Sequence, residues 1–419
     1  MNENSCPFPL YGEDFKRDPY STYARLRAEG DVHRVKFPSG VLGWLVVGYE
    51  SARAALTDSR LGKDHSLGNE AWRRLAAIMP EPQHSLLQVH LLHRDPPQHA
   101  AMRKLVLNGL TPRRIEPMRP RFERIAHDLI DEVAPSGEAD LVPAFSARFP
   151  FLVLSEAIGL PPRLRDLFDP EWCKVVRPVG PQDPLRDTYI ALLEGLRHYI
   201  DGVVAHKRAH PEDDLLTDLV RASSAGEITE PELTSSIFQL LVAGQEPVSN
   251  QITTALVALL THPDQLDLLV ANPELREPAV EELMRYDSAF ELTTWRFFSE
   301  TTRLHDATIP AGDSVIVSLA SANRDPAQFP DADRLDVTRA ANGQLGFGHG
   351  IHYCAGAALG RMELQIALGA IIERLRNLRL TVPPDHLPWV QAVLGRGTQS
   401  LPVSFTPENA RAHRQEVTH

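Results

Sequence analysis

Apolar residues recur at three- and four-residue spacing through most of the chain, which predicts a mainly helical protein. The clearest case is residues 229–262. Thr229 is followed three positions later by Glu232, with Pro231 between them, and this pattern predicts a capped helix start. A buried stripe then runs through Ile237, Leu240, Leu241, Ile252, Ala255, Leu256 and Leu259. At ~1.5 Å per residue, this segment predicts one helix about 50 Å long in a central position.

The remaining pattern adds helices and a few short strands. Helices are predicted over residues 274–286 and 355–377. A hairpin is predicted from 32–37 and 44–47, and single strands from 308–310, 314–319 and 399–405. Residues 62–98 show little periodicity and predict a long, partly helical loop, a kind of segment that often carries function. The fold class is therefore mainly α with small β-sheets.

Composition narrows the functional class. The chain has 419 residues, of which 43% are hydrophobic and 23% charged, as in globular proteins. The net charge of −12 argues against general nucleic-acid binding. No apolar run approaches a membrane span, and residues 1–16 resemble no signal peptide, so we expect a soluble cytoplasmic protein without membrane association. With no linker or repeat, residues 1–419 are expected to form a single domain.

One cysteine lies in a segment suited to chemistry. Residues 346–363 form a glycine-rich loop that carries Cys354 into a helix. Glycines let the backbone approach a flat ligand, and a helix N-terminus favours a thiolate, which suits an axial haem ligand. Two alternatives are a turn of small residues with a buried thiol, and a zinc site using His349, His352 and Cys354, which lacks a fourth ligand. Cys6 and Cys173 are expected to be ordinary reduced thiols.

The full pattern around this cysteine, F-x-x-G-x-H-x-C-x-G over 347–356, resembles the cytochrome P450 family, in particular its soluble bacterial members. Further segments resemble the family at 95–103, at 282–285 (E-x-x-R), at 323–326 and at 329–334. The resemblance covers nearly the whole chain. It implies the cytochrome P450 fold, with haem b between a long central helix and the Cys-ligand loop.

The resemblance also implies roles for single residues. Cys354 would be the axial ligand of the haem iron, in a loop with Phe347, Gly348, His352 and Gly356. The haem propionates would be bound by His99, Arg103, Arg296 and His352. Glu282 and Arg285 would be a structural pair, although by themselves they would indicate an ordinary surface salt bridge.

The central helix departs from the family pattern. It reads Ala243-Gly244-Gln245-Glu246-Pro247, where members usually carry an acid followed by threonine. Glu246 matches the acid, whereas Pro247 replaces the alcohol of the pair held to deliver protons during O2 activation. Proline donates no N–H to the Ala243 carbonyl, so the helix is expected to kink or open there. The freed carbonyl would hold water or substrate, or Pro247 would simply set the bend.

The resemblance implies an oxidoreductase that activates O2 and hydroxylates a small natural product of secondary metabolism. Electrons would come from NAD(P)H through a reductase and a ferredoxin or flavodoxin. Docking of that partner is suggested by a basic cluster, Lys104, Arg113, Arg114, Arg119, Arg121 and Arg361, although a solvated helical face explains it equally. Two alternatives are oxidative C–C, C–O or C–N coupling at the same site, and a non-catalytic haem-binding sensor.

Substrate contacts are the least specific part of the interpretation. The candidates are Gln239, Val242, Phe290, Leu292, Thr293 and Trp295, with Glu291 as a further polar anchor, and core packing is the alternative for each. His84, His90 and His93 lie unusually close together and are interpreted as solvated loop residues.

Overall fold

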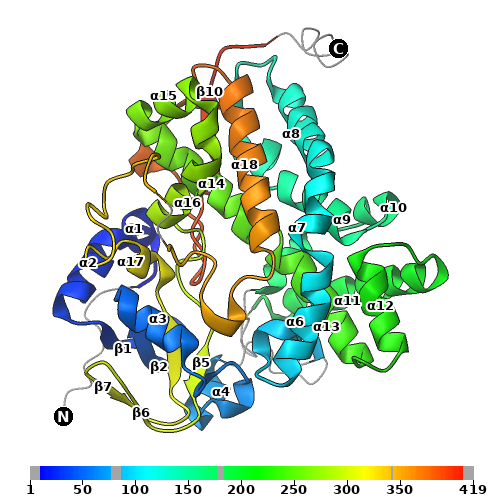
Figure 1. Ribbon diagram of the computed structural model, residues 1–419, viewed down its shortest axis with the longest axis vertical. Coiled ribbons are helices and arrows are strands. Elements are labelled where there is room, and N and C mark those ends of the chain that lie inside the picture. The colour runs from blue at the N-terminus through cyan, green and yellow to red at the C-terminus, as the bar shows by residue number, and fades with distance from the viewer. Residues whose placement is uncertain (1–9, 77–85, 177–183, 341–342, 409–419) are drawn as a thin grey trace.

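The computed structural model describes residues 10–76, 86–176, 184–340 and 343–408, and most of this part of the chain is helical (Figure 1). The α-helices up to the middle of the chain are α1 (Glu13–Arg17), α2 (Pro19–Glu29), α3 (Tyr49–Thr57), α4 (Glu70–Ala76), α6 (Gln98–Gly109), α7 (Pro112–Ile115), α8 (Arg119–Val133), α9 (Phe149–Ile158) and α10 (Pro162–Arg165). The others are α11 (Arg186–Ala209), α12 (Leu215–Ser224), α13 (Glu230–Ala243), α14 (Glu246–Thr261), α15 (Pro263–Ala271), α16 (Arg276–Tyr286), α17 (Leu319–Asn323) and α18 (Ala357–Arg374).

The strands form three small sheets. The largest has the order β1-β2-β8-β5-β3, built from β1 (Val32–Lys36), β2 (Leu42–Val46), β8 (Ser314–Val317), β5 (Arg296–Phe298) and β3 (Leu61–Gly62). Within it only β2 and β8 run parallel, with Leu45 opposite Ile316. The second sheet joins β4 (Glu138–Asp140), β10 (Pro402–Ser404) and β9 (Arg379–Leu380), and the third pairs β6 (Thr302–Leu304) with β7 (Ala307–Ile309).

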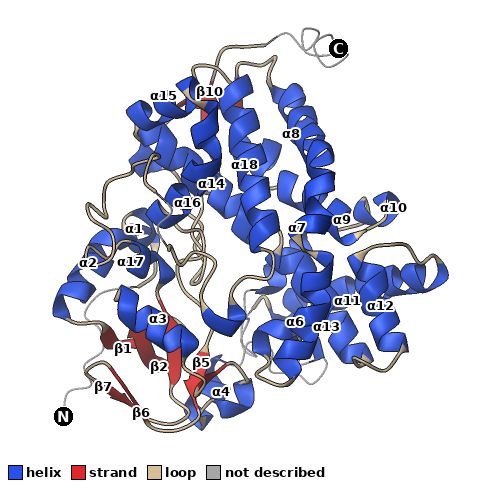
Figure 2. Ribbon diagram, in the orientation of Figure 1, coloured by secondary structure: helices blue, strands red, loops and turns tan. Residues whose placement is uncertain are grey.

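The large sheet and the helices occupy different parts of the molecule. Figure 2 shows the large sheet at one end, beside α3 and α4, while the helices fill the rest. One apolar core holds the helical part together and includes Phe122 of α8, Leu196 of α11 and Ile371 of α18. Smaller cores lie around the sheet, for example around Leu45 and Ile316. Leu61 and Gly62 of β3 belong to the sheet, whereas Leu87 belongs to the helical core.

The predicted central helix exists, but as two helices. The capping box at Thr229 is present and starts α13 at Glu230 as expected. However, α13 ends at Ala243 and α14 begins at Glu246, so a single 50 Å helix is wrong, whereas the opening expected next to Pro247 is confirmed. The physical reason is that Pro247 has no N–H to continue the helical hydrogen-bond pattern.

The other predicted elements are confirmed with shifted ends. β1 and β2 pair as the antiparallel hairpin, α16 and α18 are the expected later helices, and β7, β8 and β10 are the expected strands. The region 62–98 contains short helices: η1 (His65–Leu67), α4, η2 (Leu86–Gln88) and η3 (Leu91–His93). Among the described residues, no helix is both long and apolar enough to cross a bilayer.

Candidate functional site

The loop before α18 holds Cys354 in a narrow turn. The Cys354 N–H donates to the Phe347 carbonyl at 2.9 Å, and Gly348 N–H to the Leu345 carbonyl at 2.7 Å. Gly348 and Gly350 both have φ of 74°, a left-handed conformation that favours glycine. A Cβ on Gly350 would lie 2.3 Å from the Leu56 carbonyl oxygen. The glycines are therefore required for the loop path that presents the cysteine.

The sulfur lies deep in the protein and still has free surface. Burial raises the pKa of the Cys354 thiol above its ordinary value, and the Gly356 N–H and the charges of Arg103 and Arg361 offset this only in part. The cysteine side chain is nevertheless exposed, so space remains in front of the sulfur. Phe347 packs against Gly360 of α18 and carries the Arg361 guanidinium 4.5 Å from its ring centroid. This arrangement fits a cysteine whose sulfur meets a ligand inside the molecule.

The four basic residues predicted to bind carboxylates come together beside this loop. The rings of His99, on α6, and His352 lie 4.3 Å apart. Arg296, the first residue of β5, is 5% exposed and its charge acts on both imidazoles. Arg103 follows one turn after His99 on α6 and acts electrostatically on His99 and on Cys354. Residues from distant parts of the sequence thus form one basic cluster.

The nitrogens of this cluster are buried without protein partners. His99 Nε2, His352 Nε2 and Arg296 Nε are inaccessible and have no hydrogen-bond partner. Burial lowers the pKa of Arg296 to about 10 and that of His352 to about 4. A buried cation without a partner costs free energy, and a charge-assisted hydrogen bond to a carboxylate offsets that cost. Together with the thiol, these donors fit a flat group that carries two carboxylates, as haem does.

One acid lies at the edge of the cluster. Asp95 Oδ1 lies 4.0 Å from His352 Nε2, and Asp95 accepts the backbone N–H groups of Lys63 and Asp64. Burial alone would raise the pKa of Asp95, but these bonds and His352 lower it to about 2. Asp95 therefore remains charged, but its oxygens already accept several hydrogen bonds.

Glu282 and Arg285 form a buried pair rather than a surface salt bridge. Both side chains are 0% exposed, and Arg285 Nε donates to Glu282 Oε2 at 2.7 Å. Arg285 also donates to the carbonyls of Asn323, Ala332 and Arg334. The pair therefore fixes the 323–334 segment against α16. The surface interpretation of this motif is wrong.

At the break between α13 and α14, a side chain replaces a backbone donor. Gln245 is buried, and its Nε2 donates to the Leu241 carbonyl at 2.6 Å. The Gly244 N–H still reaches the Leu240 carbonyl at 3.1 Å. Ala243 is exposed although it ends a central helix. The carbonyls near the end of α13 therefore lie at an opening, as expected from Pro247.

Three candidates for substrate contact are occupied by the protein itself. Leu292 is 2% exposed and packs in the core around Ile316. The Thr293 hydroxyl accepts the Val317 N–H at 3.0 Å. Glu291 is 0% exposed and paired with Lys16 of α1. The segment runs beside the sheet, where core packing and pairing use these side chains, which favours the alternative of core packing; their role in substrate binding stays a prediction.

The other candidates keep accessible surface. Gln239 and Val242 on α13 are half-buried, as is Phe290. Trp295 is also half-buried, with its ring 4.8 Å from that of Phe37 in an edge-to-face contact. Their role in substrate binding stays a prediction.

The histidines interpreted as solvated are largely inside the protein. His84 lies outside the described residues. His93 lies between His65 and His90, with ring centroids 4.2 and 4.6 Å away. Burial lowers the pKa of His65 to about 4 and that of His90 to about 3. The solvated interpretation is wrong because this segment packs against Trp72 and the Phe238 ring of α13.

Most of the predicted basic docking cluster forms ion pairs. Arg114 pairs with Asp218 at 2.9 Å, and Arg361 pairs with Glu281. Arg119 and Arg121 also have acidic neighbours, at 3.3 and 3.4 Å. Lys104 and Arg113 are exposed. A docking role for this surface stays a prediction.

The structure adds one residue that sequence reasoning missed. Lys63 is fully buried beside Arg296 and His352, and no motif marks it. The available signal was a lysine directly after the apolar strand residue Leu61 and Gly62.

The zinc alternative finds no support, because no group of at least three acidic, His or Cys side chains in the described ranges is arranged to hold a metal ion.

Comparisons with known proteins agree with the geometry of this site. The family model described as "Cytochrome P450" matches residues 269–403. The chain is 43% identical to the cytochrome P450 monooxygenase PikC of Streptomyces venezuelae, with 94% of this chain and 92% of the relative covered. It is 38% identical to 6-deoxyerythronolide B hydroxylase of Saccharopolyspora erythraea, with 94% of this chain and 98% of the relative covered.

A solved structure supports the same assignment at the level of the fold. The cytochrome P450 enzyme CxnD, described for C–S bond formation in chuangxinmycin biosynthesis, matches with a TM-score of 0.84 at 36% identity. The match covers 93% of this chain and 96% of that one. The helical arrangement around the cysteine loop is therefore shared over nearly the full length.

Proposed function

Because this chain belongs to the cytochrome P450 family of haem-dependent monooxygenases, we propose that it uses haem b and O2 to hydroxylate a small natural-product substrate. The observation that supports this most directly is the buried set of unpartnered basic nitrogens beside Cys354. In this proposal residues 1–419 act as a single catalytic domain.

The residues present divide the binding of haem between its iron and its carboxylates. Cys354 would ligate the iron, and His99, Arg103, Arg296 and His352 would hold the propionates. When bound, haem supplies an iron centre that activates O2, and a thiolate ligand favours O–O cleavage. Phe347, Gly348 and Gly356 would let the loop lie close beneath the flat group.

The break between α13 and α14 supports an unusual proton route. Pro247 leaves the Ala243 carbonyl without its helical donor, and Gln245 stabilises the opening through the Leu241 carbonyl. We propose that water bound at this opening relays protons from Glu246, which is half-buried at the start of α14. Gly244 gives the opening room, because a Cβ there would lie 2.7 Å from a Leu154 methyl.

Substitution of Glu246 tests this route. Positioned proton transfer contributes ~10²–10⁴-fold to rate, so Glu246→Gln should reduce product formation at least about tenfold and raise hydrogen peroxide release. Product and peroxide are measured by chromatography and a peroxidase-coupled assay. Unchanged product formation, with inactivity only towards substrate analogues lacking a hydroxyl, would instead assign the proton to the substrate.

Pro247→Thr tests the opening from the other side. The threonine supplies a helical N–H and an alcohol but removes the free carbonyl. Native turnover should slow while haem content stays at one per chain. Equal or faster turnover would show that the opening has no part in the reaction.

Oxidative coupling is the second candidate reaction. It is favoured by the missing alcohol at Pro247 and by the description of CxnD, a structural relative, as a C–S bond-forming enzyme. Labelled O2 separates the two reactions: hydroxylation incorporates one oxygen atom into the product, whereas coupling incorporates none. Electrons from NAD(P)H through a reductase and a ferredoxin or flavodoxin are proposed for both reactions. A non-catalytic haem sensor would give no substrate-dependent O2 consumption with any such donor.

A further inference from the structure

Lys63 is a buried amine with a single neutral acceptor. The residue follows β3 directly and is 1% exposed. Its Nζ donates to Thr294 Oγ1, and no carboxylate within ion-pair distance of it is found among the described residues. Burial accordingly lowers the pKa of Lys63 well below its ordinary value. A buried ammonium costs several kcal/mol, and one hydroxyl does not compensate for it.

At Lys63 the neighbouring cation Arg296 outweighs the neighbouring acid Asp95. The charge of Arg296 acts directly on Lys63. Lys63 lowers the pKa of His352 more than Arg296 or His99 does. Lys63 therefore lies in the same basic cluster as the predicted propionate ligands. Asp95, the acid that acts on Lys63, is already bonded to the backbone N–H groups of residues 63 and 64.

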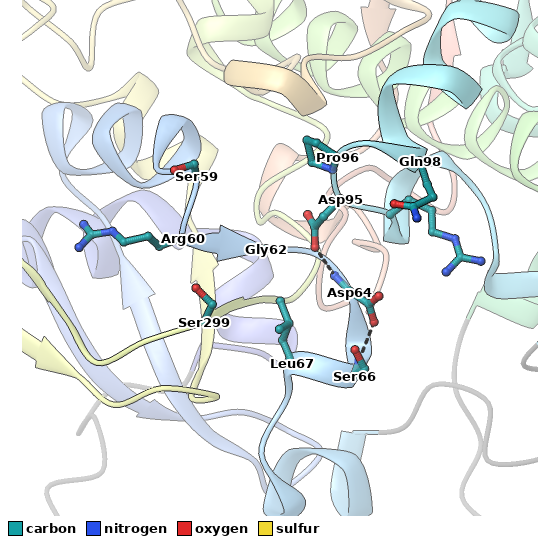
Figure 3. Close-up of a pocket in the computed structure, with 11 residues that line it drawn as sticks. Ser59, Arg60, Gly62, Asp64, Ser66, Leu67, Asp95, Pro96, Gln98 and Ser299 are labelled. Carbon is teal, nitrogen blue, oxygen red and sulfur yellow. Dashed lines mark hydrogen bonds between the residues drawn. The ribbon is translucent and has the colours of Figure 1, made fainter.

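Lys63 lies behind the lining of a surface pocket. A surface pocket of about 360 Å³ is lined by Gly62, Asp64, Arg94 and Asp95, together with Ser59, Arg60, Ser66, Leu67, Pro96, Gln98 and Ser299. Figure 3 shows Asp95 bonded to the backbone at Asp64 along this pocket. The residues on both sides of Lys63 line the pocket, but Lys63 itself does not. Its amine therefore points away from this pocket, into the interior.

We propose that Lys63 is a further haem-propionate ligand and that Thr294 positions its amine. A carboxylate would form an ion pair with the buried ammonium and so compensate its burial. The propionates are proposed to lie at the basic cluster that includes this ammonium. The inference rests on the proposed haem-binding function. A carboxylate of the substrate would satisfy the same chemistry, and the experiment separates the two sources.

The test compares Lys63→Met with Lys36→Met in the substrate-free holoenzyme. Lys36 is an exposed residue of β1, so its variant removes the same charge away from the site. The resonance Raman propionate mode reports hydrogen bonds to the propionates directly. It should shift in Lys63→Met and stay unchanged in Lys36→Met.

The reduction potential gives a second readout. A cation near haem favours the more negative ferrous form, so its loss should shift the ferric–ferrous equilibrium roughly tenfold towards ferric. For a one-electron couple this is about 59 mV. Thr294→Val should have a reduction potential close to that of the wild type, because the Lys63 charge remains. Its propionate Raman mode should be broader, because the amine is no longer positioned.

Three outcomes decide the matter. Unchanged Raman mode and potential in Lys63→Met, with weaker binding only of acidic substrates, would assign Lys63 to the substrate and overturn the proposal. If Lys63→Met retains no haem, Lys63→Arg decides: a shifted propionate mode supports the proposal and an unchanged one contradicts it. Wild-type protein without thiolate-ligated haem would instead overturn the proposed function itself.

Discussion

Two buried charged regions of the molecule differ in their charge balance. Near the N-terminus, Lys16 pairs with Glu291, and Arg396 donates to Asp287 at 2.8 Å. Beside the cysteine loop, Lys63, Arg296, His99 and His352 lie near Asp95, the acid that acts on them among the described residues. The first region pairs each of these cations with a carboxylate, although Glu291 Oε1 itself accepts no hydrogen bond, whereas the second leaves basic nitrogens without partners.

This difference separates structural charge from charge that serves a ligand. A buried ion pair contributes to the fold only while both partners are present. A buried basic cluster whose nitrogens lack hydrogen-bond partners is costly in the free protein and is explained when a dianionic ligand compensates it. The same chemical change should therefore have different consequences in the two regions.

The largest effect is expected in the balanced region. Lys16→Met leaves Glu291 buried without its main partner, which should lower the free energy of unfolding by about 3–5 kcal/mol. Urea denaturation followed by circular dichroism measures this. The double variant Lys16→Met/Glu291→Leu should recover much of the loss, because no unpaired charge then remains. A single variant as stable as the wild type would show that this pair does not support the fold.

The next effect is the acid sensitivity of the histidines beside Lys63. Burial and the charge of Lys63 lower the pKa of His65 to about 4, and burial with the charges of His65, Lys63 and Arg94 lowers that of His90 to about 3. Unfolded imidazoles have a pKa of about 6.5, so below that pH the unfolded chain takes up protons that the fold excludes. Stability should therefore be complete above pH 6.5 and fall as the pH drops towards 4.

For His65 this linkage amounts to roughly 3 kcal/mol by pH 4. The charged neighbours of His65 act on its pKa in both directions: His93 and Lys63 oppose its protonation, and Asp64 favours it. His65→Phe should flatten the decline in urea midpoint between pH 6.5 and 4. An unaltered pH profile in this variant would contradict a buried, neutral His65.

A smaller effect is expected from the propionate arginine. Arg296→Met removes one charge-assisted bond, worth ~1.5–3 kcal/mol, so haem transfer to apomyoglobin should accelerate roughly tenfold or more. Unlike Lys16→Met, it should leave the urea midpoint of haem-free protein unchanged or higher, since it relieves repulsion. Unchanged haem transfer would remove Arg296 from the predicted propionate ligands.

The parts of the site that sequence predicted well depend on local spacing. The loop at Cys354 and the opening at Pro247 each follow from a few consecutive residues, whereas the buried pair Glu282–Arg285 was placed through the family resemblance. His99 and His352 were placed through a family resemblance, and the structure brings their rings together. Short-range patterns carry such information because local geometry follows from neighbouring residues.

The parts that sequence did not predict depend on tertiary packing. Lys63 and Thr294 meet across distant segments, and nothing at residue 63 indicates which side of the chain its amine faces. Leu292 and Thr293 are candidates for substrate contact by side-chain type, yet sheet contacts bury both. His90 and His93 looked solvated because their partner His65 lies far away in the sequence.

The absorption spectrum of the reduced protein under CO tests the central claim most directly, because it reports haem and thiolate ligation together. The wild type should show the spectrum of thiolate-ligated haem. Cys354→Ala should lose it, while Cys6→Ala and Cys173→Ala keep it. Retention of the thiolate-type spectrum in Cys354→Ala, or its absence from the wild type, would contradict the assignment of this site.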